Sequence, residues 1–524
     1  MFSKGIIRLT KKQIKLQKCN IADICGGQNI RKGLVVGVYE DCGSNALKLS
    51  PAGNKFDVES GGRISEIIKG TDMSLGKVKV INNLGTDFYA VAVAGTGADS
   101  ACYNENETLD ECKENIRISS AVGAQALQEM GCAEILVDGY TNTEAAAEGS
   151  SLGVWRYQDL KSKEHQLTEP NLSLFDDPDA DGWQTGLWKA DAQNIVRKLE
   201  ETPANLMYPS AFAEAAIDIL CPCGVHVEVR DRDWITDKHM TAFLAMSRSS
   251  CNPAMLLECS YCGGGESDKP VVLTGKGVTF DAGGLCLKRH SKNFEEHRAD
   301  MAGAAVIVGV LKAMARLQVP MNVNALIPLM ENMPGNMAMK PGDVVVSLNG
   351  KTIRIENPDN EGRVILADCL TFSNEYKPCL TINIATLTAA VRHALGSSAS
   401  AAFCTSEVVW KELAKAGAET GDRVWRFPAW KMFTTKVTDW EGVDVHNVGC
   451  GRGGDPCLGA AFLMEFAPPV DFLHLDITGT GMSASGACGN PPYYRKGFMT
   501  GRPTRALQQF LSQMACPLDR PTTC

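Results

Sequence analysis

Five side chains between residues 271 and 368 have the types and spacing of metal ligands. They are Lys276, Asp281, Asp300, Asp359 and Glu361. Each of the four acids lies where an apolar run gives way to a glycine-containing loop or to the start of a helix. The carboxylates can therefore project from the strand ends of a buried sheet, which is where α/β enzymes build their sites.

The donor types narrow the choice of metal. Magnesium usually takes only one or two protein carboxylates, and zinc normally recruits His or Cys, but the eight His residues form no HExxH motif or spaced pair. Three Asp, one Glu and one Lys suit a two-metal centre, in which bridging carboxylates hold two ions about 3.5–4 Å apart. Ordinary strand-end acids without a metal would show the same spacing, so on spacing alone both interpretations stay open.

The elements that must position these residues follow an α/β pattern. From about residue 225 on, nearly continuous apolar runs such as VVLTGKGVTF, MNVNALIPL and CLTINIATLT alternate with segments expected to be helical, at 237–246, 303–317 and 362–376. Apolar strands interleaved with helices predict a mixed, mainly parallel sheet covered by helices on both faces.

The N-terminal third predicts a second, smaller α/β domain. The β-rich runs LVVGVYE, VKVINNL, FYAVAVAG and AEILVDG alternate with helical patterns, notably at 116–130, and carry no acid cluster. Gly95-Thr96-Gly97 follows an apolar strand, but the rest of a dinucleotide-binding fingerprint is missing, so we expect a tight turn there.

The length of the chain also favours two domains, because 524 residues exceed what one hydrophobic core usually organises. Segment 167–181 contains two Pro and five acids and predicts a surface loop or linker. We place the boundary near residue 185, with an N-terminal domain at 31–185 and a larger C-terminal catalytic domain at 186–524.

Composition argues against several classes of function. With 61 acidic against 52 basic residues the net charge is -9, which gives no support to nucleic-acid binding. No stretch approaches the roughly 18 uninterrupted apolar residues of a membrane span, so a membrane protein is not expected. The 20 Cys residues are too few for a disulfide scaffold and are expected to be mainly buried small hydrophobes.

The first 20 residues contain six Lys or Arg and no acid. On a helix the basic residues fall on one side and the apolar residues roughly opposite, which predicts a mitochondrial transit peptide within residues 1–30. An ordinary basic N-terminal arm on a cytoplasmic protein is the alternative.

Three sequence blocks carry a resemblance to a known family. GKGVTFDAGG, RADMAGAA and NPDNEGRVILAD resemble the signature blocks of the leucyl (cytosol) aminopeptidase family, and the similarity runs from roughly residue 140 to 515. The resemblance implies a dimetal-dependent aminopeptidase that removes N-terminal amino acids from short peptides through a metal-bridging water. The family also includes sperm mitochondrial paralogues, a type that fits the basic leader.

The resemblance implies two divalent ions per subunit, Zn²⁺ or Mn²⁺. One ion would be held by Asp281, Asp359 and Glu361. The second would be held by Lys276, Asp281, Asp300 and Glu361. A Lys ligand must be neutral, which requires a strongly lowered pKa that an adjacent dication supplies.

Two further cations have implied catalytic roles. Lys288 would stabilise the developing oxyanion, and Arg363 would hold a bicarbonate ion that shuttles a proton. The family is hexameric, so a homohexamer is the expected assembly.

Several positions differ from the residues that are usual in the family, and they cluster around the expected specificity pocket. His297 stands where Met is common, Ala389 where Gly is usual, Thr478 in place of Ala, and Gly481 in place of Met. We therefore expect a specificity that is not strictly for leucine. The rival hypothesis is a catalytically weak member that serves as a structural or packing protein. The expected substrate-pocket residues are His297, Thr386, Ala389, Thr478 and Gly481.

Overall fold

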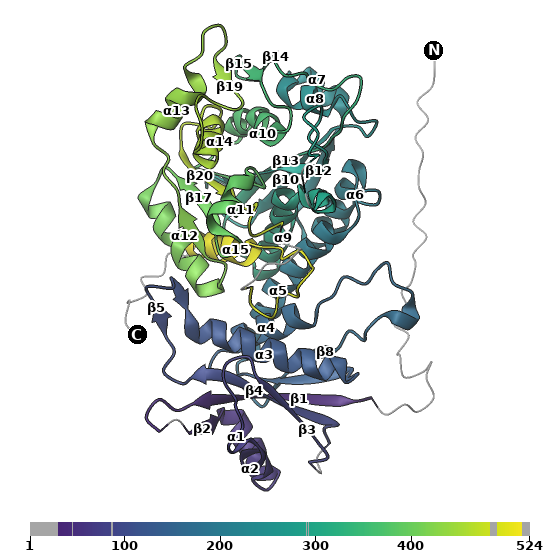
Figure 1. Ribbon diagram of the computed structural model, residues 1–524, viewed down its shortest axis with the longest axis vertical. Coiled ribbons are helices and arrows are strands. Elements are labelled where there is room, and N and C mark those ends of the chain that lie inside the picture. The colour runs from purple at the N-terminus through teal and green to yellow at the C-terminus, as the bar shows by residue number, and fades with distance from the viewer. Residues whose placement is uncertain are drawn as a thin grey trace.

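A computed structural model describes residues 30–515 apart from 45, 85–86, 290, 292 and 483–489. Two sheets organise this part of the chain, one of six strands near the N-terminus and one of nine strands beyond it. Figure 1 shows them in the lower and upper parts of an elongated molecule, with α5 (Ala180–Glu201) between them. The predicted two-domain α/β fold is confirmed. The basic leader lies outside the described residues.

The N-terminal sheet has the strand order β3-β4-β1-β7-β8, with β2 paired to β1. Strand β1 runs parallel to both β4 and β7. Its side chains alternate, since Leu34, Val36 and Val38 pack against α1 and α2, whereas Val35 and Tyr39 face α3 and α4. The elements are β1 (Lys32–Glu40), β2 (Leu47–Leu49), α1 (Pro51–Glu59), α2 (Arg63–Ile68), β3 (Val78–Asn82), β4 (Ala90–Ala98), α3 (Glu111–Glu129), β7 (Glu134–Asp138), α4 (Thr143–Val154) and β8 (Asn171–Phe175).

The expected loop at 167–181 is partly wrong, because β8 forms within it and pairs in parallel with β7. Leu172 and Leu174 pack against the N-terminal core, while the prolines and acids lie on either side of the strand. Helix α3 starts earlier than expected, at Glu111, because the Asp110 side chain accepts a hydrogen bond from the backbone N–H of Lys113. The domain boundary near residue 185 falls inside α5 and stays a prediction.

The nine-stranded sheet has the order β18-β17-β20-β16-β11-β13-β10-β9, with β12 paired to β13. Its central strands β20, β16, β11 and β13 are parallel to one another, as β12 is to β13. Antiparallel pairs occur toward both edges. The strands are β9 (His226–Arg230), β10 (Met255–Cys262), β11 (Val271–Gly275), β12 (Gly277–Asp281), β13 (Asn322–Asn332), β16 (Leu380–Ala385), β17 (Ser400–Cys404), β18 (Val424–Arg426) and β20 (Asp471–Asp476).

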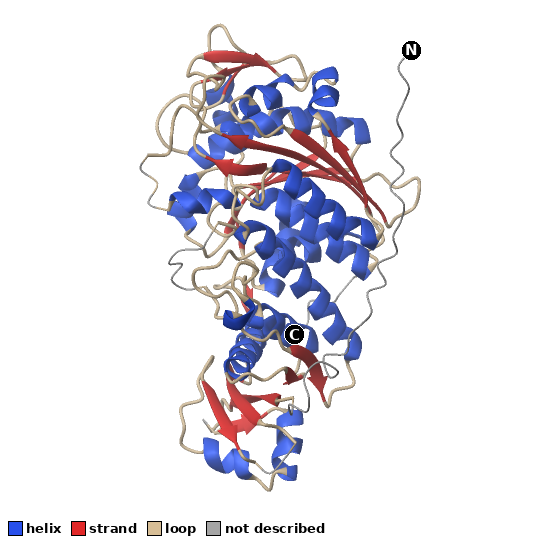
Figure 2. Ribbon diagram, turned by 90° about the vertical axis from the view of Figure 1, so that its right-hand side faces the viewer, coloured by secondary structure: helices blue, strands red, loops and turns tan. Residues whose placement is uncertain are grey.

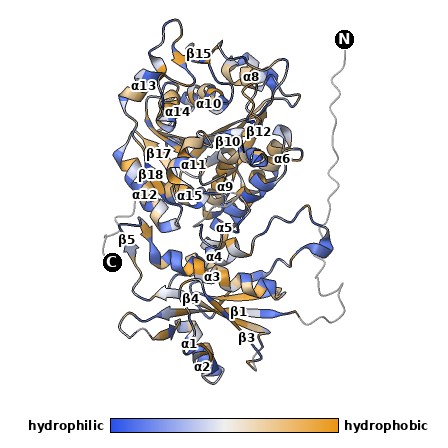
Figure 3. Cartoon of the chain, in the orientation of Figure 1, coloured by the Kyte–Doolittle hydropathy of each residue, from blue (hydrophilic) through white to orange (hydrophobic). Residues whose placement is uncertain are grey.

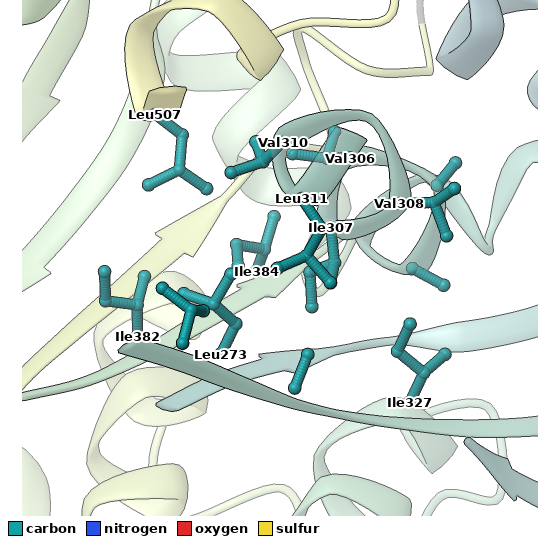
Figure 4. Close-up of a cluster of buried hydrophobic side chains, with 14 of the residues drawn as sticks. Leu273, Val306, Ile307, Val308, Val310, Leu311, Ile327, Ile382, Ile384 and Leu507 are labelled. Carbon is teal, nitrogen blue, oxygen red and sulfur yellow. The ribbon is translucent and has the colours of Figure 1, made fainter. Parts of the chain in front are cut away.

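Helices cover both faces of this sheet (Figure 2). Figure 4 shows side chains of α9, among them Ile307 and Leu311, packed toward Leu273 and Ile382 of the strands. Figure 3 shows hydrophobic colouring on strands and helices inside both domains. One face carries α6 (Pro209–Leu220), α9 (Ala302–Leu317), α12 (Glu407–Thr420) and α15 (Thr504–Ala515), and the other carries α7 (Arg232–Asp237), α8 (Thr241–Ser247), α10 (Glu361–Phe372) and α14 (Asp455–Met464).

Two of the three helices expected in the catalytic domain are confirmed as α9 and α10. The helix expected at 237–246 is wrong, because α7 ends at Asp237 and α8 begins at Thr241. His239 lies between them with φ +58°, in the left-handed region that stops a right-handed helix. Among the described helices, none combines the length and apolar character needed to cross a membrane.

A buried ion cluster joins the two domains. Glu148 of α4 accepts hydrogen bonds from Arg117 Nε of α3, at 2.6 Å, and from Arg505 NH1 of α15, at 2.8 Å. Arg117 also donates to the backbone carbonyl of Glu419 in α12. All three charged side chains are at most 3% exposed. The domains are therefore packed through desolvated charges whose partners come from both sides.

Candidate metal centre

The expected metal ligands lie at the carboxyl ends of the central strands. Lys276 lies between β11 and β12, and Asp281 is the last residue of β12. Asp300 lies two residues before α9, whose N-terminal dipole favours a negative charge there. Asp359 lies two residues before α10, and Glu361 is the first residue of that helix. Five side chains from four short segments thus meet at one edge of the sheet.

Lys276 lies at the centre of this cluster. Its Nζ is 2.6 Å from Asp300 Oδ2 and 2.8 Å from Glu361 Oε1. It also donates to the backbone carbonyl of Thr386, at 3.0 Å. Lys276 is 4% exposed, so the amine is shielded from bulk water and contacts two carboxylates from different loops.

Lys288 reaches the other side of the same carboxylates. Its Nζ is 2.9 Å from Asp281 Oδ2 and 2.5 Å from Asp359 Oδ1. Its side chain is 18% exposed, whereas that of Lys276 is 4% exposed. Lys288 therefore lies on the more open side of the cluster.

The donor set fits a divalent cation. Carboxylate oxygens of Asp281, Asp300 and Glu361 all lie within 4.8 Å of one another, and all three residues are buried. Anionic oxygens that converge in a buried site are the ligands that hard divalent ions prefer, and the Lys276 amine among them is a nitrogen donor when neutral. The residues present therefore fit a metal.

Burial and mutual repulsion shift the pKa values of the clustered carboxyl groups. Burial, together with the charge of Asp281, raises the pKa of Glu361 to about 8. Burial also raises the pKa of Asp359 to about 7 and that of Asp300 to about 6. Burial would raise the pKa of Asp281 as well, but the ammonium groups of Lys288 and Lys276 lower it below its usual range. Additional positive charge is therefore favoured in this cluster.

The Lys276 side chain depends on a glycine in α10. A Cβ placed on Gly362 would lie 2.6 Å from Lys276 Cε. Any side chain at this position would displace the amine from its carboxylate partners. This close approach gives a physical reason for the glycine between Glu361 and Arg363.

Arg363 extends the cluster beyond the carboxylates. Its NH1 donates to the backbone carbonyl of Asn447, at 2.7 Å, and the residue is 3% exposed. Its Nε forms no hydrogen bond with any residue that the structure describes. The guanidinium is thus held at one end and keeps donor capacity at the other.

Some of the expected pocket residues contact the carboxylate cluster or its neighbours, and others do not. The Thr386 hydroxyl donates to Asp300 Oδ1 at 2.6 Å, and Gly481 packs near Ala302 at the start of α9. Ala389 is exposed at the first position of α11 (Ala389–Leu395). Segment 483–489, which follows Gly481 closely, lies outside the described residues.

The two polar replacements in the expected pocket already have protein partners. The Thr478 hydroxyl donates to Asp476 Oδ1 at 2.6 Å, and His297 Nε2 lies 3.0 Å from Ser291 Oγ. Burial and the ammonium of Lys288 lower the pKa of His297 to about 4, so its ring is neutral at pH 7. An apolar substrate side chain would therefore leave neither group without a hydrogen bond.

Two Asn residues that were not expected help to hold the cluster together. Asn332, at the end of β13, donates to Asp281 Oδ1 at 2.8 Å and to the carbonyl of Pro358 at 3.1 Å. Asn447 accepts from the backbone N–H of Glu356 through Oδ1 and donates to the carbonyl of Asn357. Their only sequence signal is a polar residue next to a strand end, which many structural Asn residues share.

Carboxylates and amines buried at the carboxyl ends of a parallel sheet define a metal-dependent α/β enzyme. Two family models specify it further. The catalytic domain of the cytosol aminopeptidase family matches residues 194–508, and the N-terminal domain of that family matches residues 35–164. The chain therefore belongs to the cytosol aminopeptidase family, and it is a metallo-aminopeptidase that acts on peptides.

Individual relatives agree with the family models. The chain is 41% identical to the cytosol aminopeptidase of Sus scrofa and 40% identical to that of Homo sapiens, each over 489 residues that cover 92% of this chain and 93% of the relative. Among solved structures it is similar to the bottromycin maturation enzyme BotP, with a TM-score of 0.78 and 27% identity over 93% of this chain and 99% of that chain. The same enzyme in complex with Mn matches with a TM-score of 0.77 and 28% identity, over 93% of this chain and all of that chain.

Proposed function

We propose that the chain is a dimetal aminopeptidase whose specificity is not strictly for leucine. The observation that carries this proposal is the convergence of carboxylates from three loops around the Lys276 amine. Asp281, Asp359 and Glu361 would hold one ion. Lys276, Asp281, Asp300 and Glu361 would hold the second, so Asp281 and Glu361 would serve both ions.

The metals would be Zn²⁺ or Mn²⁺, and the Mn complex of BotP supports the choice of Mn²⁺ for a test. When bound, such ions polarise a carbonyl and activate water. The protein itself holds the ligands in place and buries them. Burial excludes bulk solvent and so strengthens each electrostatic contact within the cluster.

Lys288 and Arg363 would act on the substrate side of the cluster. The Lys288 ammonium lies on the more open side, where it can donate to a developing oxyanion. Arg363 keeps an uncommitted donor at Nε, which supports bicarbonate as the anion held there for proton transfer. Loss of turnover with full metal content in Lys288→Ala and Arg363→Ala would support these roles.

The specificity would be set by pocket shape and residual polarity. Thr478 and His297 would place polar atoms beside the substrate, but their existing hydrogen bonds would reduce the cost of binding an apolar side chain. We expect the enzyme to hydrolyse leucyl amides. Compared with relatives that have Met and Ala at these two positions, it should prefer small or polar N-terminal residues more strongly. A panel of aminoacyl-amides with Mn²⁺ or Zn²⁺ tests this specificity. Full metal occupancy without turnover on any member of the panel would favour the packing-protein alternative.

Assembly and location belong to the same proposal. We expect a homohexamer, which light scattering tests, and a monomer near the chain mass of 56.4 kDa would contradict it. We expect import into mitochondria with removal of about the first 30 residues, as the cationic amphipathic leader suggests. Terminal sequencing of native protein checks the cleavage, and an intact Met1 or Phe2 would favour the cytoplasm.

A further inference from the structure

The N-terminal domain contains a cavity of about 220 Å³ that is separate from the carboxylate cluster. Tyr39, Ala98 and Thr141 line it, so it lies beyond the carboxyl ends of β1, β4 and β7. The chain runs from β1 to β4 on one side of β1 and then crosses to β7 on the other side. In open α/β sheets, ligands bind where the strand order reverses in this way.

A β-bulge shapes one wall of the cavity. Val38 pairs with Gly95 and Tyr39 pairs with Gly97, so Thr96 is the extra residue on β4. Gly97 has φ +75°, which a residue with a side chain adopts only with strain. The Gly95-Thr96-Gly97 motif is therefore a bulge within β4 that turns Thr96 toward the cavity. The tight turn expected there from the sequence is wrong, because the motif continues the strand. Such bulges often re-aim side chains beside binding sites.

Two neighbouring hydroxyl groups line the cavity. Tyr39 is 9% exposed, and its phenol lies beside the side chain of Thr141 and interacts with it. Each hydroxyl can both donate and accept, so the pair can also serve a polar atom of a ligand. Asn115 lies in the same lining and offers a further polar group.

One cation and one anion also line the cavity. Lys48 Nζ and Asp99 Oδ2 are 3.8 Å apart, and their side chains are 66% and 28% exposed. A long, solvated ion pair contributes little to stability, so opening it costs little. A phosphate would be repelled by Asp99 and a simple cation by Lys48, whereas a zwitterion satisfies both.

We propose that this cavity binds a free α-amino acid, with its carboxylate at Lys48 and its ammonium at Asp99. Leu49 and Pro51 offer apolar surface to the side chain. The volume is below the ~300 Å³ of typical drug-sized pockets and suits one residue. The choice of ligand rests on the proposed function, because an aminopeptidase releases free amino acids, but binding requires no catalysis.

The test is calorimetric titration of free leucine into the full-length Asp281→Asn variant, after elemental analysis has shown that this variant holds no metal, so that leucine cannot bind through the metal centre. One saturable site is expected. Leucinamide, which lacks the carboxylate, and 4-methylpentanoate, which lacks the ammonium, should each bind at least about tenfold more weakly. Equal binding of all three compounds, or no saturable leucine binding, would overturn the proposal.

Substitutions in the same background locate the site. Lys48→Ala and Asp99→Asn should each weaken leucine binding about tenfold or more, and Tyr39→Phe by a smaller factor. Lys79→Ala is the matched control, because Lys79 is an exposed lysine of β3 outside the cavity, and it should bind leucine normally. Normal leucine binding by both Lys48→Ala and Asp99→Asn would exclude this cavity.

Wild-type hydrolysis and metal content, measured in parallel, separate this proposal from the proposed function. If the wild type hydrolyses peptides while the Asp281→Asn variant fails to bind leucine, only the cavity proposal is wrong. If the wild type binds no metal and hydrolyses nothing, the proposed function is wrong whatever the titration shows.

Discussion

The side-chain amide of Asn332 lies 2.8 Å from Oδ1 of Asp281 and donates a hydrogen bond to it. The same amide nitrogen reaches the carbonyl of Pro358, in the loop that carries Asp359. One neutral, buried side chain therefore fixes the orientation of a carboxylate on β12 relative to the acidic loop before α10.

We predict that Asn332→Ala weakens metal binding by about 10–100-fold, because loss of a group that orients metal ligands has effects of this size. Titration of the metal-free protein with Mn²⁺ measures this affinity directly. Asn322→Ala, at the opposite end of the same strand, is the control and should bind Mn²⁺ normally. Unchanged affinity in Asn332→Ala would show that Asp281 is held well enough without it.

Asp281→Asn should remove both metal ions, since this carboxylate is the proposed ligand of each. Asp343→Asn, in the hairpin of β14 (Asp343–Val346), serves as a control outside the cluster. Elemental analysis of the purified variants gives the metal content per chain. Full metal content in Asp281→Asn would refute the proposed coordination.

Lys276→Arg should abolish metal binding at the second site and reduce turnover by at least about 100-fold. A guanidinium stays protonated in proteins and is bulkier than an amine. Gly362→Ala should have a similar but smaller effect, because its Cβ would meet Lys276 Cε at 2.6 Å. Metal content and turnover, measured together, check both variants, and wild-type values in Lys276→Arg would contradict the role of the amine.

The pocket prediction concerns His297→Met combined with Thr478→Ala. Removing the two polar side chains should raise kcat/KM for leucyl amides relative to seryl amides, because a leucine side chain then no longer packs against polar groups. The increase should be only a few-fold, because each polar group already has a protein partner and its cost to leucine binding is therefore modest. Kinetics on the two amides give this ratio for wild type and variant. A ratio that does not change would show that pocket shape alone sets the specificity.

Glu148→Gln should destabilise the fold by about 1.5–3 kcal/mol, because two buried guanidinium groups lose the carboxylate that they share. The loss is limited because Arg117 keeps Glu114 and Arg505 keeps Asp422 as acidic neighbours. Burial alone would raise the pKa of Glu148, but Arg117 and Arg505 lower it to about 2, against an ordinary value of 4.5. The stabilisation from its charge is therefore complete above about pH 4.5 and is lost as the pH falls toward 2. Thermal unfolding at several pH values should show a smaller acid-dependent loss in the variant than in the wild type.

The sequence predicts the sheet, two of the three expected catalytic-domain helices and the convergence of the four acids, because each of these has a local signal. Periodicity marks α9 and α10, and an acid at the end of an apolar run is conspicuous. The break between α7 and α8 has no such signal, because His239 adopts its left-handed conformation in the folded context. Strand β8 is similarly hidden, since its flanking prolines and acids dominate the composition of 167–181.

Partners that are distant in sequence cannot be predicted from spacing. Asn332 and Asn447 act through hydrogen bonds to loops 26 and 90 positions away, so only the folded arrangement identifies them. The partners of Thr478 and His297 likewise become visible only in the structure. Residue types in the expected pocket therefore overstate its polarity.

The ion cluster around Glu148 has a consequence for the independence of the two domains. A chain cut near residue 185 would leave Glu148 and Arg117 in one fragment and Arg505 in the other. Each fragment would expose charges that the intact protein buries and neutralises. Although two family models divide the chain, we expect the domains to unfold in a single cooperative transition and to be poorly exchangeable as separate modules between distant relatives.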